Sequence, residues 1–210
     1  MTTADVPAAT PRRRRIFLDA SRLPQHAFGS SDLLWWGTAG FVAIEGTMFA
    51  MVFATVFYLR SIGPWPPPPY AAPDLLWGTV NTLVLFASSA TLRRAVRAIG
   101  AGDATTLTRG LAATTLLGAG FLAGQAWAWH DLLRAGVTME GAYGTVFYWL
   151  TGLHAAHVLG GLIFLAVCQA RALLGRYTRD SHLGVELCEI YWHFLGAVWL
   201  VLVALLFALL

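Results

Sequence analysis

The chain has 210 residues, of which 57% are hydrophobic and 12% are charged, and its formal net charge is +3. A water-soluble domain of this length usually has about a quarter of its residues charged. The composition therefore excludes a soluble globular enzyme, a disordered tail and a nucleic-acid-binding module. It indicates a protein that crosses a membrane several times.

Five apolar stretches are each long enough to cross a bilayer as a helix, which takes about 20 residues. They lie at residues 33–59, 75–95, 109–130, 145–170 and 186–209. The segments between them are short and contain the turn-forming residues. We therefore predict an all-α integral membrane bundle of five transmembrane helices, which occupies residues 31–210.

The distribution of arginine predicts how the chain is oriented, because all fourteen basic residues are arginines. Five precede the first predicted span, and the successive loops carry one, four, one and three, so twelve lie on one side of the membrane and two on the other. The positive-inside rule then places the N-terminus in the cytoplasm and the C-terminus in the periplasm. Residues 1–30 are expected to form a mobile basic cytoplasmic arm that is retained, since no apolar signal region follows its arginines.

Ionisable side chains inside a membrane are costly, and they are usually functional. The predicted spans contain six of interest: Glu45, His154, His157, Glu186, Glu189 and His193. At 1.5 Å per residue, Glu45 lies about 18 Å and His157 about 20 Å from the cytoplasmic face, whereas His193 lies only about 10 Å from it. We therefore expect Glu45 to bond His157, or else His154, and His193 to lie in a separate layer.

The histidine spacings also raise the question of a metal site. His-x-x-His and Glu-x-x-x-His place side chains on one face of a helix, as metal ligands often are. A metal site needs three or four ligands at one depth, and two separate layers do not supply them. We therefore expect hydrogen bonding between helices, with metal or haem ligation as the alternative.

The carboxylates of the first and last spans allow more than one role. Glu45 is interpreted either as a neutral acid bonded to a neighbouring helix or as a proton-handling group. Glu186 and Glu189 lie near the cytoplasmic rim. They are expected to be solvated or to pair with Arg176 or Arg179.

Three stretches of the chain resemble subunit III of the haem–copper oxidases of the cytochrome c oxidase type. They are YGTVFYWLTGLHAAHVLGG at residues 143–161, GVELCEIYWHFLGAVW at residues 184–199, and Ile44-Glu45 with the later Asn81-Thr82. The resemblance covers residues 33–210. Many family members have two further spans before these five, and the family often has aspartate where this chain has Gly196.

The resemblance implies a non-catalytic subunit of a respiratory terminal oxidase in a bacterial inner membrane. The complex would reduce oxygen to water and pump protons, with haem and copper in partner subunits I and II and no cofactor in this chain. Arg171 matches a lipid-phosphate-binding arginine of the family, so bound phospholipid is expected. No catalytic or metal-binding residue is implied, and the buried structural positions are Glu45, His154, His157, Glu186 and His193.

Two alternatives stay open at this point. Short five-span relatives of the family also accompany nitric oxide reductases, so the chain could be an accessory subunit of such an enzyme. The other alternative is a stand-alone membrane metalloprotein or carrier that uses Glu45, His154, His157 and His193. The electron donor, cytochrome c or quinol, binds other chains and cannot be read from this one.

Overall fold

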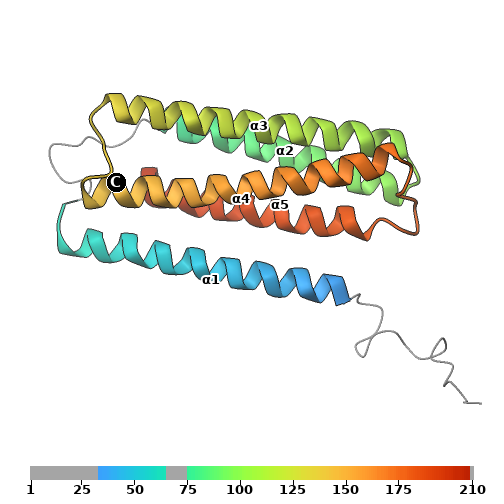
Figure 1. Ribbon diagram of the computed structural model, residues 1–210, viewed down its shortest axis with the longest axis horizontal. Coiled ribbons are helices and arrows are strands. Elements are labelled where there is room, and N and C mark those ends of the chain that lie inside the picture. Colours follow the sequence, from blue (N-terminus) through green and yellow to red (C-terminus); the bar gives the residue numbers. More distant parts are fainter. Residues whose placement is uncertain (1–32, 65–74, 209–210) are drawn as a thin grey trace, which may run out of the picture.

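The structure, a computed structural model, describes residues 33–64 and 75–208 (Figure 1). Its helices, in chain order, are α1 (Leu33–Ile62), α2 (Leu75–Gly100), α3 (Ala104–Arg134), α4 (Ala142–Leu173) and α5 (Leu183–Val203), with a π-helical turn η2 (Ala204–Ala208) after α5. The described ranges contain no β-strand. The predicted all-α architecture of five long helices is confirmed, whereas the predicted arm at residues 1–30 lies outside the described residues.

Four of these helices combine the length and the hydropathy of membrane spans, namely α1, α3, α4 and α5 with its extension. The remaining helix, α2, has 26 residues. At 1.5 Å per residue it is about 39 Å long, which exceeds the hydrocarbon core of about 30 Å. Arg93, Arg94 and Arg97 in its last turns make it less apolar, and it lies along α3 in the bundle (Figure 1).

Small residues bring the helices of the α2–α5 bundle close together, as is common in membranes. A Cβ atom on Gly110 would lie 2.6 Å from the Cβ atom of Ala95, so α3 and α2 are almost in backbone contact there. A Cβ atom on Gly118 would lie 2.7 Å from the indole of Trp192 on α5. The bundle therefore depends on glycine at positions where helices meet.

Tryptophan side chains connect the same helices by hydrogen bonds. The indole N–H groups of Trp129, Trp192 and Trp199 each donate over 3.0 Å to a hydroxyl on another helix. The acceptors are Thr151, Ser88 and Thr82, respectively. Such bonds satisfy polar groups that would otherwise be unpaired in an apolar environment.

Helix α1 lies apart from the other four helices (Figure 1). Its main contacts are with α5. Of its 30 residues only Phe49 and Val56 are buried, whereas α4 buries residues along its whole length. Few side chains therefore decide how α1 is held against the bundle.

Candidate functional site: a carboxyl–histidine pair between α1 and α4

The residues that hold α1 include the carboxyl–histidine pair expected from depth. Glu45 Oε2 lies 2.9 Å from His157 Nε2, and the two side chains are 17% and 16% exposed. This bond between α1 and α4 confirms the predicted contact. His157, rather than His154, is the partner.

The backbone determines the tautomer of His157. Its Nδ1 lies 2.7 Å from the carbonyl oxygen of Leu153, one turn earlier. A carbonyl oxygen only accepts hydrogen bonds, so Nδ1 carries a proton. The remaining proton is shared between Nε2 and Glu45, as an imidazolium–carboxylate pair or as a carboxylic acid donating to a neutral imidazole. Either form gives one strong bond between the helices.

Aromatic side chains surround this pair and shield it. Phe49, one turn after Glu45, is 1% exposed. Its ring centroid lies 5.2 Å from that of His157 and 6.5 Å from that of Phe194 on α5. The hydroxyl of Tyr191 donates to the carbonyl oxygen of His157 over 3.3 Å. The pair and Phe49 together connect α1 with both α4 and α5.

His154 is fully buried and serves a different contact. Its Nε2 donates to the carbonyl oxygen of Leu195 on α5 over 3.1 Å. Its ring packs 5.3 Å from that of Trp199 and 5.6 Å from that of Phe121. Within the described ranges its Nδ1 has no hydrogen-bond partner. This histidine ties α4 to α5 and takes no part in the Glu45 bond.

The second polar layer is nearer the arginine-rich end of the bundle. His193 Nδ1 donates to the carbonyl oxygen of Glu189 over 2.8 Å. The Glu189 carboxylate lies 3.4 Å from Nε of Arg93 on α2. The predicted pairing of Glu189 with Arg176 or Arg179 is therefore wrong, because α2 is the helix beside α5 at this level.

Glu186 fits the expectation of a solvated carboxylate at the rim, and not the buried position that the resemblance implies. Its side chain is 46% exposed, and its carboxylate lies 3.2 Å from Nε2 of His182. Glu186 is in the first turn of α5, at the edge of the bundle. There the chain turns back from α4, and the side chain is partly open to the surroundings.

The polar residues of the spans do not form one ligand set. In the part of the chain that the structure describes, no three His, Cys, Asp or Glu side chains gather as a group that could hold a metal ion. Glu45 and His157 bond each other, His154 bonds the α5 backbone, and His193 belongs to the second layer. The site is built for contacts between helices.

Arg171 lies at the C-terminal end of α4, where a cation interacts favourably with the helix dipole. Its side chain is exposed, and its guanidinium carbon is 5.6 Å from the ring centroid of Tyr177. Tyr177 is buried in the connection to α5. Burial, together with a hydrogen bond to Cys168, raises the pKa of Tyr177, so it remains a neutral hydroxyl.

Sequence reasoning missed several residues of these contacts. Phe49 follows Glu45 by four residues on the same helix face, a spacing that could have identified it. Tyr191 lies inside one of the recognised motifs but received no role. Arg93 was counted only for its charge. The partners of such residues depend on which helices are neighbours, which the sequence pattern leaves open.

Comparison with known proteins assigns the chain to a family. Residues 9–209 match the family model described as cytochrome c oxidase subunit III. A cytochrome c oxidase subunit 3 of Synechocystis sp. is 36% identical over 183 residues, which are 86% of this chain and 78% of the relative. A probable cytochrome c oxidase subunit 3 of Mycobacterium tuberculosis is 35% identical over 185 residues, 87% of this chain and 91% of the relative. The corresponding protein of Danio rerio is 37% identical over 183 residues, 80% of this chain and 67% of the relative. The chain belongs to the cytochrome c oxidase subunit III family.

Proposed function

We propose that the chain is the non-catalytic subunit III of a respiratory haem–copper oxidase in a bacterial inner membrane. The observation that carries this proposal is the family match over residues 9–209. Haem and copper belong to the partner subunits I and II, and oxygen reduction and proton pumping take place there. This chain stabilises subunit I and supports its proton uptake.

The contacts of the polar residues fit such a supporting role. The pair Glu45–His157 joins α1 to α4, and His154 joins α4 to α5. Each of these side chains bonds a neighbouring helix. In a membrane, hydrogen bonds between helices each contribute about 0.6–2 kcal/mol to helix association. A correctly placed α1 completes the apolar surface that would face the large subunit.

The arginines support the proposed orientation. Arg93, Arg94 and Arg97 end α2, and Arg171 ends α4, so these residues share one end of an antiparallel bundle with the start of α1. Arg60 and Arg134 lie at the other end. The positive-inside rule makes the first end cytoplasmic. The C-terminus, after η2, is then periplasmic.

Arg171 is the proposed contact for a phospholipid headgroup. Its guanidinium rests beside the Tyr177 ring and is exposed at the end of α4. A guanidinium in this position can present its N–H groups to phosphate oxygens, which it matches in geometry. The bound lipid would cover part of the membrane-facing surface of this chain near the end of α4.

The proposal is tested by purifying the chain from its native membranes in mild detergent, through an affinity tag on the C-terminus. We expect a large oxidase subunit to co-purify, with the optical spectrum of haem and with copper. Co-purification with the large subunit of a nitric oxide reductase would favour that alternative. A chain that arrives alone with a stoichiometric metal of its own would contradict the supporting role.

A further inference from the structure

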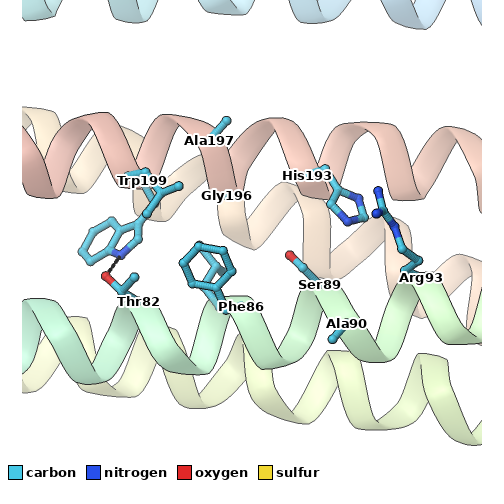
Figure 2. Close-up of a pocket in the computed structure, with 11 residues that line it drawn as sticks. Thr82, Phe86, Ser89, Ala90, Arg93, His193, Gly196, Ala197 and Trp199 are labelled. Carbon is cyan, nitrogen blue, oxygen red and sulfur yellow. Dashed lines mark hydrogen bonds between the residues drawn. The ribbon is translucent and has the colours of Figure 1, made fainter.

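An apolar groove runs between α2 and α5, formed by side chains that take no part in the Glu45–His157 pair (Figure 2). Its volume is about 430 Å³, within the range of about 300–1,000 Å³ typical of small-molecule sites. Its apolar walls include Leu85, Phe86, Ala90, Gly196, Ala197 and Leu200. Gly196 keeps the groove open, since a Cβ atom there would meet only the Ser89 hydroxyl, at 3.8 Å.

Three polar side chains lie together at one end of this groove: Ser89, Arg93 and His193 (Figure 2). The neighbouring hydroxyl of Ser88 bonds a backbone carbonyl of its own helix. Ser89 makes no such bond within the described ranges. Its hydroxyl is therefore available to a molecule in the groove.

The other two polar groups are also only partly engaged. His193 uses Nδ1 to donate to a backbone carbonyl, which leaves Nε2 as a hydrogen-bond acceptor for a ligand hydroxyl. Arg93 contacts Glu189 through Nε over 3.4 Å, and its side chain is 57% exposed. Its two terminal nitrogens have no partner in the described part of the chain. The contact with Glu189 orients the guanidinium. It leaves the edge formed by the two terminal nitrogens free to bind two oxygen atoms at once.

The length of the groove distinguishes between two kinds of occupant. Thr82 and Trp199 mark one end, and Arg93 marks the other (Figure 2). Thr82 and Arg93 are eleven residues apart on α2, which is about 16 Å. This equals roughly one leaflet of a hydrocarbon core of about 30 Å. A transmembrane helix of a partner would need a groove through both leaflets, whereas a lipid chain needs one.

The charge of the polar end favours an anionic headgroup. Arg93, Arg94 and Arg97 cluster in the last turns of α2. Glu189 is the carboxylate that contacts Arg93 there. Arginine binds phosphate oxygens in a bidentate, charge-assisted manner, and arginines near the membrane surface attract anionic lipids.

We propose that this groove binds an anionic phospholipid from the arginine-rich leaflet. Its phosphate is held by Arg93, an ester oxygen accepts a hydrogen bond from the Ser89 hydroxyl, a headgroup hydroxyl donates to Nε2 of His193, and one acyl chain lies along the groove as far as Trp199. The site is built from α2 and α5 alone, so it is separate from the contact proposed at Arg171. It also does not depend on which respiratory enzyme the chain joins.

Native mass spectrometry of the full chain in its purified complex tests this site, after exchange into nanodiscs of phosphatidylglycerol or phosphatidylcholine. We expect retention of phosphatidylglycerol and about tenfold less of it in Arg93→Gln, the effect of losing a charged hydrogen bond. Arg94→Gln removes the same charge from a residue that does not line the groove, so retention should fall much less than in Arg93→Gln. Glu189→Gln removes the carboxylate that competes with the lipid for Arg93, so lipid retention should stay the same or increase.

A second variant tests the apolar part of the groove. Gly196→Leu fills the groove and should displace the lipid, while Gly120→Leu, on an open face of α3, should not. A photo-crosslinking residue at Ala197 should attach to phospholipid. Equal retention in the Arg93 and Arg94 variants, no preference between the two lipids, or a crosslink to another subunit would each overturn the proposal.

Discussion

Helix α1 and helix α5 have the same mean hydropathy, 1.8 in their most apolar windows, yet they are held in the molecule in different ways. In α5, 44% of that window is buried, whereas in α1 it is 11%. Large side chains of α1 such as Ile44, Met51 and Phe57 remain exposed. Hydropathy places both helices in the membrane and leaves open how each one packs.

The difference shows what joins helices inside a bilayer. Lipid chains are as apolar as leucine, so close packing and hydrogen bonds decide which helices associate. The α2–α5 bundle has closely packed glycines and indole–hydroxyl bonds between its helices. Helix α1 relies on the Glu45–His157 bond and on Phe49. Its position should therefore respond strongly to changes at these few residues.

The largest effect is expected from Phe49→Ala, which removes the buried ring between α1, α4 and α5. Truncation of a buried phenylalanine typically costs about 3–5 kcal/mol in unfolding free energy, because a cavity is left behind. Unfolding by sodium dodecyl sulfate in mixed micelles would measure the loss. Phe57→Ala, on the same helix and 55% exposed, should change the stability little. Equal losses in the two variants would mean that Phe49 has no special part in holding α1.

A glycine series compares the two regions directly. Gly118→Leu on α3 inserts a side chain against Trp192, and overpacking of this kind costs about 1–3 kcal/mol. Gly40→Leu on α1 and Gly120→Leu on α3 add the same side chain where nothing lies within 4 Å. Thermal unfolding should show a lower midpoint only for the first variant. A similar shift for Gly40→Leu would show that α1 is packed more tightly than its contacts indicate.

Glu45→Ala should loosen α1 by about 1–3 kcal/mol, since it leaves the half-buried His157 without its partner on α1. In the complex we expect lower stability or less sustained turnover while oxygen chemistry persists. Thr47→Ala is the control, because its hydroxyl bonds only the backbone of its own helix. Complete loss of oxygen reduction in an intact complex would contradict a supporting role.

Trp199→Phe tests a bond within the bundle. It keeps the aromatic contact with Phe121 but loses the donation to Thr82, which is 3.0 Å long. A typical loss is about 0.5–1.5 kcal/mol, measurable in the same detergent titration. Trp127→Phe, at a ring that is 55% exposed, should be close to neutral.

The smallest effect concerns the start of α3. Asp103 caps this helix through the backbone N–H of Thr106. Its hydrogen bonds with Thr106 lower the pKa of Asp103 from the ordinary value of 3.8. The cap therefore stabilises the fold above pH 3.8, and this contribution is lost as the pH falls through the lowered pKa. Thermal midpoints of Asp103→Ala and the parent chain should differ at pH 7, and this difference should shrink as the pH is lowered below 3.8.

The sequence predicts those features that depend on position along a helix. Apolar length identified the five helices. The rise per residue gave Glu45 and His157 matching depths, and because rigid antiparallel helices preserve depth, the bond between them could be foreseen. The separate layer of His193 follows from the same arithmetic.

Features that depend on the order of helices around the bundle could not be predicted in this way. Depth alone does not reveal that α2 lies beside α5, so the contact of Arg93 with Glu189 was missed. The exposure of Glu186 depends on where the α4–α5 connection leaves the bundle. The groove likewise requires Ser89 and Gly196 to face each other from two helices, which no single-helix pattern encodes.

One polar pair, Glu45–His157, connects α1 to the bundle, and a double-mutant cycle tests this connection most directly. The unfolding free energies of the parent chain, Glu45→Ala, His157→Ala and the double variant would be compared in mixed micelles. We expect the sum of the unfolding free energies lost in the two single variants to exceed the loss in the double variant by about 1–2 kcal/mol, as for residues in direct contact. Additive losses, within about 0.5 kcal/mol, would contradict this connection.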